Sequence, residues 1–155
     1  CPNGTYTLPS VVESNWPCIL FRSDPHMFTD AEYFCERYDG RLFSVPNGFV
    51  NILVTDFINA DYPNVCVWIG VTQLVGGIWK NVDNGKNATY FNWAVGEPVN
   101  YSGYNCVYMD SQGYWYTYNC SGNCISVCGV PETEATSSPK IEENGFKPYP
   151  IKKAD

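Results

Sequence analysis

Apolar residues between positions 29 and 40 recur at the spacing of a helix. One helical face carries the residues at i, i+3, i+4 and i+7, namely Ala31, Phe34, Cys35 and Tyr38. Thr29 and Glu32 match a capping box, in which each side chain hydrogen-bonds the backbone N–H of the other residue. Gly40 follows at the place where a helix would stop. The pattern predicts a first helix that ends before Gly40.

A second run of helical spacing begins after Asn47, a residue type that caps helix N-termini well. The run continues to about Ala60, and its apolar positions include Phe49, Val50, Leu53 and Phe57. Between the two helical runs, residues 41–45 have the pattern of a short strand. The first half of the chain therefore predicts two helices joined through one strand.

The second half of the chain changes to short runs of β-branched and aromatic residues, which predict strands. These runs are 65–69, 78–82, 106–109, 114–118 and 125–128. Asp110-Ser-Gln-Gly113 separates two of the runs as a hairpin turn. Helices first and antiparallel strands afterwards predict an α+β fold.

Two stretches show no hydrophobic period. Residues 84–105 are rich in Gly, Asn, Tyr and Pro, and a loop of this length inside a compact domain is usually functional. Residues 131–155 combine Pro, charges of both signs and few large apolar side chains, which is typical of a tail or linker. We expect one domain over residues 1–130 and a tail over 131–155, with only Phe146–Ile151 apolar enough to dock on the domain.

The charge balance excludes some classes of partner. The chain has 9 Lys and Arg against 16 Asp and Glu, and residues 1–130 alone carry five cations and eleven carboxylates. Nucleic-acid binding requires clustered Lys and Arg, which the chain lacks. No apolar run approaches the roughly 18 residues of a membrane span. We expect neither nucleic acid nor a membrane as partner.

The cysteines indicate an oxidising compartment. Their even number and wide spacing are typical of four disulfides in a secreted protein. They are Cys1, Cys18, Cys35, Cys66, Cys106, Cys120, Cys124 and Cys128. A zinc site is disfavoured, because the one close set of cysteines spans 120–128 and His26 is the sole histidine. Four glycosylation sequons agree with secretion, at Asn3, Asn87, Asn100 and Asn119.

An ordered series of landmarks over residues 1–130 resembles a C-type lectin-like domain. The landmarks are Cys1–Gly4, Ala31…Cys35…Gly40, Leu42–Val45, Trp68–Gly70, Trp79, Asn92-Trp93, Gly96–Pro98, Asn105–Val107, Gly113–Trp115 and Cys120…Cys128. Each is weak alone, but the ordered set is specific, and the run Ser44–Asn51 is similar to secreted nematode members. The resemblance implies a double-loop fold with adjacent termini, two helices flanking small antiparallel sheets, and a binding site on the long loop.

The resemblance also implies the covalent framework. It pairs Cys1 with Cys18, Cys35 with Cys128, and Cys106 with Cys120, which leaves Cys66 for Cys124. From the sequence alone, eight cysteines permit 105 connectivities. A cis peptide bond between Glu97 and Pro98 is a further implication of the resemblance.

Calcium binding is not expected. Sugar-binding members of the family hold Ca²⁺ through Glu-Pro-Asn or Gln-Pro-Asp, an acid before the Asn/Asp-Cys step, and Trp-Asn-Asp. This sequence keeps Glu97, whereas the other four ligand positions hold Val99, Tyr104, Tyr116 and Thr117. Because Ca²⁺ takes six to eight oxygens, one carboxylate is too few, and we expect no cofactor. Any calcium that did bind would use Glu97, Asn100 and Asn105, and a glycan on the Asn100 sequon would crowd a sugar pocket.

Tyrosine is abundant in the long loop and in the strands after it. Tyrosine offers a large contact area at a low entropy cost, and it stacks on sugar rings. For the family core positions Trp68, Trp79, Trp93 and Trp115 we favour packing over binding, whereas both roles stay open for the tyrosines. The candidate binding surface comprises Glu97, Val99, Asn100, Tyr101, Tyr104, Asn105, Tyr116 and Thr117.

These observations predict a secreted recognition module that binds a glycan or a protein without the usual calcium chemistry. A calcium-dependent lectin with atypical ligands is the alternative, and a thermal stability that rises with Ca²⁺ would favour it. A structural or ice-binding role would need a flat Thr-rich face, which the sequence lacks. An enzyme is not expected, because the cysteines are committed to disulfides and His26 lies outside the long loop.

Overall fold

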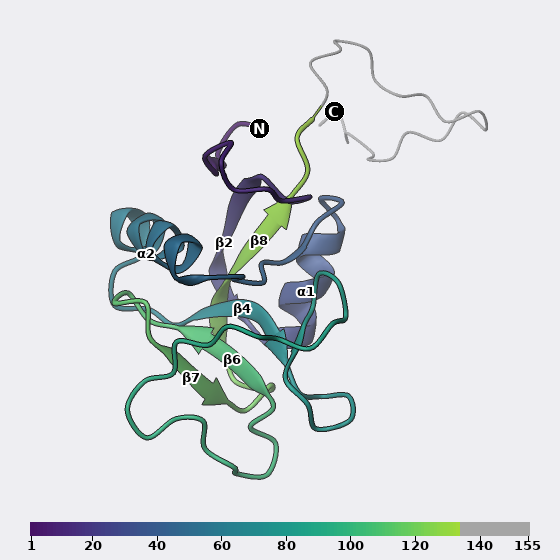
Figure 1. Ribbon diagram of the computed structural model, residues 1–155, viewed down its shortest axis with the longest axis vertical. Coiled ribbons are helices and arrows are strands. Elements are labelled where there is room, and N and C mark those ends of the chain that lie inside the picture. The colour runs from purple at the N-terminus through teal and green to yellow at the C-terminus, as the bar shows by residue number, and fades with distance from the viewer. Residues whose placement is uncertain (134–155) are drawn as a thin grey trace, which may run out of the picture.

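The computed structural model describes residues 1–133 of the 155-residue chain (Figure 1). The predicted tail lies outside the described residues from position 134 onward. The elements in chain order are β1 (Tyr6–Thr7), β2 (Cys18–His26), α1 (Phe28–Glu36), β3 (Arg41–Leu42), α2 (Gly48–Asp61), β4 (Val67–Thr72), β5 (Lys80–Asn81), β6 (Cys106–Met109), β7 (Trp115–Tyr118) and β8 (Cys124–Val130).

The described strands form one sheet in the order β1-β2-β8-β4-β6-β7, with β3 paired to β8 and β5 paired to β4. β8 is buried along its whole length because β2, β3 and β4 all pair with it. In Figure 1, α1 and α2 lie on opposite sides of the β2–β8 pair. The pairs Tyr6↔Ile19 and Cys18↔Val130 bring the N-terminal hairpin beside the last strand. The fold is α+β, as the sequence predicts.

The sheet is mixed, which differs from the antiparallel arrangement expected from the sequence. β4 and β8 run parallel, with Val67 opposite Ile125 and Trp68 opposite Ser126. A parallel pair needs a long crossover connection. Here the chain passes through β5, the long loop, β6 and β7 before it returns as β8.

The structure contains strands that the sequence pattern does not predict. β2 is nine residues long, but its second half contains Ser23-Asp24-Pro25, residues typical of turns. The register with β8 shifts between Arg22 and His26, so this irregular end of the strand follows a bulge rather than regular pairing. The local composition therefore does not predict a strand here. His26 ends β2 and is partly buried.

The second helix follows its sequence pattern, and the first departs from it. Asn47 caps α2, because its Oδ1 accepts a hydrogen bond from the Val50 N–H at 2.9 Å. The capping box expected at Thr29 is wrong. The cap residue of α1 is Met27, and it makes no side-chain capping bond. Tyr38 lies beyond the end of α1 and is exposed, so it is not part of the buried helical face.

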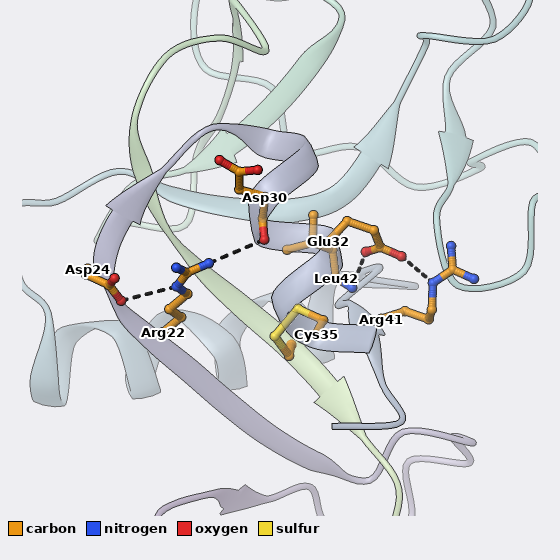
Figure 2. Close-up of a disulfide and its surroundings, with 8 residues drawn as sticks. Arg22, Asp24, Asp30, Glu32, Cys35, Arg41 and Leu42 are labelled. Carbon is orange, nitrogen blue, oxygen red and sulfur yellow. Dashed lines mark hydrogen bonds and ion pairs between the residues drawn. A yellow bond between two sulfur atoms is a disulfide. The ribbon is translucent and has the colours of Figure 1, made fainter. Parts of the chain in front are cut away.

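Glu32 explains why the capping box does not form. Its carboxylate accepts hydrogen bonds from the Leu42 N–H at 2.7 Å and from the Arg41 side chain, so it joins α1 to β3 (Figure 2). After the helix, the left-handed conformation belongs to Asp39 rather than to Gly40. Gly40 is needed for a different reason, since a Cβ atom there would collide with the carbonyl oxygen of Gly129.

Buried aromatic residues fill the interior on both sides of the sheet. Trp68 and Trp115 are fully buried, while Trp79 and Trp93 pack against the core, in line with the preference for packing. Four disulfides add to this core, and they are the pairs that the resemblance implies: Cys1–Cys18, Cys35–Cys128, Cys66–Cys124 and Cys106–Cys120. Figure 2 shows the bond from Cys35 of α1 to the neighbouring β8.

Candidate functional site

The long loop lies along the outer edge of β7, the last strand of the sheet (Figure 1). The Trp115 N–H donates to the Asn92 carbonyl oxygen, and the Ala94 N–H donates to the Trp115 carbonyl oxygen, each at 2.9 Å. The Asn92 side chain also donates to the carbonyl oxygen of Gly113 at 2.6 Å. The loop is thereby paired with β7 at Trp115, which fixes its position against the β6–β7 hairpin.

Glu97 is tied back to this hairpin by its own carboxylate. Its Oε2 accepts hydrogen bonds from the Thr117 hydroxyl at 2.5 Å and from the Thr117 N–H and the Val99 N–H, each at 3.1 Å. The Val99 N–H also lies 3.2 Å from the Thr117 hydroxyl oxygen. The Glu97–Pro98 peptide bond is cis, as the resemblance implies. These bonds make Glu97, Val99 and Thr117 one closed cluster.

The remaining loop residues of the candidate surface differ in their surroundings. Asn100 is exposed. Asn105 is half-buried, and its carbonyl oxygen accepts from the Thr72 hydroxyl at 2.8 Å and from the Gln73 N–H at 2.9 Å. Its backbone oxygen therefore fastens the end of the loop to β4. Over residues 1–133, no three His, Cys, Asp or Glu side chains gather closely enough to hold a metal ion.

Five tyrosines form a continuous row of ring contacts beside this cluster. We call it the tyrosine row, and its members are Tyr101, Tyr104, Tyr108, Tyr116 and Tyr118. Tyr101 meets Tyr104 edge-to-face at 5.3 Å between ring centroids, and Tyr104 meets Tyr118 in the same way at 6.2 Å. Tyr118 meets Tyr108 at 5.5 Å, and Tyr108 stacks on Tyr116 at 5.1 Å. The row thus runs from the long loop across β6 and β7.

The alternation of β7 explains why these rings share one face. Trp115 and Thr117 point into the core, so Tyr116 and Tyr118 point outward. Tyr108 lies directly opposite Tyr116 on β6 and adds a third ring to that face. Tyr101 is 64% exposed, and the other members are half-buried. Each ring except that of Tyr101 therefore combines packing with partial exposure.

Carboxylates set the electrostatics of the tyrosine row. Asp110 accepts a hydrogen bond from the Tyr116 hydroxyl at 3.1 Å. The pKa of Tyr116 is raised mainly by burial, and further by the hydrogen bond to Asp110 and the charge of Glu97. Burial, the neighbouring Tyr116 and the same two carboxylates also raise the pKa of Tyr108. Both phenols therefore lie close enough to these carboxylates to be affected by their charge.

The structure places six of the eight candidate residues in two groups, and Asn100 and Asn105 belong to neither. Hydrogen bonds join Glu97, Val99 and Thr117, and ring contacts place Tyr101, Tyr104 and Tyr116 in one row. The candidate set omitted Tyr108, Tyr118 and Asp110. Alternating tyrosines at 114–118 were the available signal, but the pairing of Tyr108 with Tyr116 depends on the strand register.

Two further observations concern accessibility and membranes. The four sequon residues Asn3, Asn87, Asn100 and Asn119 are exposed. Neither helix within residues 1–133 is long and apolar enough to cross a membrane.

Comparison with known proteins identifies the family. The family model "Lectin C-type domain" matches residues 24–130. The C-type lectin lectoxin-Phi1 of Philodryas olfersii is 28% identical over 123 residues, which cover 77% of this chain and 74% of that protein. Asialoglycoprotein receptor 2 of Mus musculus is 28% identical over 126 residues, which cover 76% of this chain but 40% of the receptor.

Solved structures agree with the family model. The carbohydrate-recognition domain of the mouse scavenger receptor C-type lectin superposes with a TM-score of 0.72 at 24% identity, and the alignment covers 86% of this chain and 98% of that domain. This likeness shows the fold, and the family model covers most of the chain. The chain belongs to the C-type lectin domain family.

Proposed function

We propose that residues 1–130 form an extracellular recognition domain that binds a glycan or a protein ligand without calcium. Its family consists of binding proteins rather than enzymes. The names of two relatives, an asialoglycoprotein receptor and a carbohydrate-recognition domain, support a glycan or glycoprotein ligand. Four disulfides and four exposed sequons support an extracellular location. Residues 131–155 would act as the tail or linker.

The donor set around Glu97 does not fit the calcium ion that the family typically binds. Ca²⁺ needs six to eight oxygens, several of them anionic. The corresponding positions offer one carboxylate and the side chains of Val99, Tyr104, Tyr116 and Thr117. The observation that carries the proposal is that the Glu97 carboxylate already accepts three hydrogen bonds from Thr117 and Val99. Three protein donors on one oxygen of the single carboxylate at these positions support binding without a cation.

The proposed contact surface is the loop and the face of the hairpin next to it. It comprises Glu97, Val99, Asn100, Tyr101, Tyr104, Asn105, Tyr116 and Thr117, together with Tyr108 and Tyr118 of the tyrosine row. Rings that are already ordered by their neighbours lose little side-chain entropy when a ligand covers them. Such a surface suits stacking against sugar rings or against the side chains of a protein.

Calcium titration and ligand binding test the proposal together. We expect the melting temperature to be the same within about 1 °C in millimolar Ca²⁺ and in EDTA, because no calcium is linked to folding. We also expect binding on a glycan and glycoprotein array to survive EDTA and to weaken in Tyr101→Ala. A rise of several degrees with Ca²⁺, with array binding abolished by EDTA, would instead establish the calcium-dependent lectin.

A further inference from the structure

The tyrosine row lies in a part of the chain that lacks basic side chains. From Asn87 to Pro139 the sequence contains no Lys, Arg or His. The strands β4, β6 and β7, on which the row rests, carry no charged residue. The charged groups that act on Tyr108 and Tyr116 are the carboxylates Glu97 and Asp110. The ionised groups that act on these two rings of the row are therefore acidic.

Like the carboxylates, the aromatic rings of the row favour a positively charged ligand. The face of each ring carries the negative part of its quadrupole, so it attracts a cation within about 6 Å of the ring centre. The molecule makes such a contact elsewhere, since the Arg22 guanidinium carbon lies 4.7 Å from the centre of the Phe34 ring. At the tyrosine row, the rings and carboxylates are present, and no basic residue of the neighbouring sequence pairs with them.

The shape of the surface indicates how a ligand would lie on it. The row has four successive ring contacts that cross the loop and both strands of the hairpin. Cavities of about 460 and 240 Å³ lie elsewhere, and none of their lining residues belongs to the row. The N–H groups of Trp115 and Thr117 in β7 are already bonded to the loop, so a ligand is expected to bind through side chains rather than as an added strand. An extended segment fits this surface better than a compact small molecule.

We infer that the tyrosine row binds an extended, Lys- or Arg-containing segment of a partner protein, with its cationic side chains over the tyrosine rings and beside Asp110 and Glu97. This inference rests on the proposed calcium-free recognition and specifies its partner chemistry. Charge complementarity selects the occupant, because an acidic or phosphate-bearing ligand would meet two carboxylates and no nearby basic residue in the sequence around the row.

A set of matched peptides tests the inference. The probes are blocked peptides of alternating Gly and Lys, Gly and Gln, or Gly and Glu, titrated in EDTA against the full chain while tyrosine ring signals are followed by NMR. We expect the Lys peptide alone to shift the signals of the tyrosine row. Because the contact is electrostatic, raising the salt from about 20 to about 500 mM weakens it several-fold.

Matched variants measure separately what the ring, the hydroxyl and the carboxylate charge contribute to peptide affinity. Tyr116→Leu removes an outward ring and lowers the affinity about two- to five-fold, the size of a surface cation–π contact. Tyr116→Phe keeps the ring and most of the affinity. Asp110→Asn removes the charge, while its Oδ1 can still accept from the N–H groups of Gln112 and Tyr114, and it weakens binding as well. Tyr33→Leu, at an exposed position of α1, is the unaffected control.

The outcomes distinguish this inference from the proposed function. Equal binding of the Lys and Gln peptides, or an affinity unchanged in Tyr116→Leu, overturns the inference. If no peptide binds but neutral glycans bind in EDTA and lose affinity in Tyr101→Ala, the inference fails and the proposed function stands. If all ligand binding requires Ca²⁺, both fail.

Discussion

Asn51 shows how a single polar side chain holds the hairpin of the candidate site in place. It is 5% exposed, its Nδ2 donates to the Gly113 carbonyl oxygen at 3.0 Å, and its Oδ1 accepts from the Trp115 indole N–H at 2.8 Å. Asn51→Ala leaves the buried Trp115 indole N–H unpaired, whereas the Gly113 carbonyl oxygen keeps its bond from Asn92, so we expect the free energy of unfolding to fall by about 1–3 kcal/mol. Urea unfolding measures this loss. Asn59→Ala, exposed on the same helix, should change it by less than about 0.5 kcal/mol.

Tyr6 gives a prediction for alkaline pH. Its hydroxyl donates to Asp61 Oδ2 at 2.5 Å, and this bond, followed by burial and the charge of Asp61, raises its pKa to about 12 from an unfolded value of 10. Because the folded pKa is the higher one, the contribution to stability is complete below pH 10 and is lost as the pH rises toward 12. We expect Tyr6→Phe to cost at most about 1 kcal/mol at pH 8. The difference from wild type should shrink between pH 10 and 12, and a constant difference would contradict this.

In the first helix, the contact that forms differs from the one that the sequence motif predicts. Thr29 and Glu32 match a capping box, yet the Glu32 carboxylate accepts from Leu42 and Arg41 instead (Figure 2). Burial raises the pKa of Glu32 despite these donors. We expect Glu32→Ala to lower the free energy of unfolding by about 2 kcal/mol, because the Leu42 N–H loses its acceptor. Thr29→Ala should change the free energy of unfolding by less than about 0.5 kcal/mol. A larger loss would mean that Thr29 does cap the helix, as the sequence motif predicts.

Elements governed by local signals could be predicted from the sequence. Asn47 and the apolar spacing after it predict α2, and Asp110–Gly113 with its flanking runs predicts the β6–β7 hairpin. β2 could not be predicted in this way, because Ser23-Asp24-Pro25 is typical of a turn and the strand exists through its pairing with β8. Glu32 is a similar case, since its partner Leu42 lies ten residues away.

The candidate site was predictable as a region but not as a set of contacts. The period-free stretch 84–105 and the abundance of tyrosine indicate where the site lies. The closed cluster depends on Thr117, twenty residues from Glu97; the resemblance implies that these two positions lie close together, but it does not predict the hydrogen bond between them. The tyrosine row likewise depends on strand register, which places Tyr108 opposite Tyr116.

Restoring the family's usual calcium-ligand side chains in the loop and in β7 tests whether their absence explains the expected lack of calcium binding. We expect the combined variant Val99→Asn, Tyr104→Glu, Tyr116→Asn and Thr117→Asp to be less stable than wild type in EDTA. The carboxylate introduced at position 117 would repel Glu97 and replace the hydroxyl that now donates to it. Millimolar Ca²⁺ should raise the melting temperature of the variant by several degrees, because the new oxygens supply the hard anionic donors that calcium needs.

The wild-type chain measured in parallel is the control for this variant. Its melting temperature should not respond to Ca²⁺. A variant that folds but also shows no response would mean that the loop backbone, and not only the four side chains, departs from a calcium-binding geometry.

At the scale of the whole molecule, the basic residues are concentrated in the first part of the chain, and the disulfides link segments that are far apart in the sequence. The basic residues of the domain lie before Asn87, whereas the loop and hairpin that follow combine tyrosines with carboxylates. Disulfides join distant parts of the same chain, and Cys35–Cys128 ties α1 to the last strand. The proposed recognition surface thus extends from a scaffold held by α1, β2 and β8.

The two extreme disulfides should differ in their contribution to stability. Cys35–Cys128 closes a separation of 93 residues and Cys106–Cys120 one of 14. Because a cross-link restricts the unfolded chain more when its loop is longer, replacing both cysteines with Ala should cost about 4–5 kcal/mol for the first pair and about 3 kcal/mol for the second. Urea unfolding of the two double variants measures the difference. Equal losses, or a larger loss for Cys106–Cys120, would mean that local packing around the β6–β7 hairpin outweighs chain entropy.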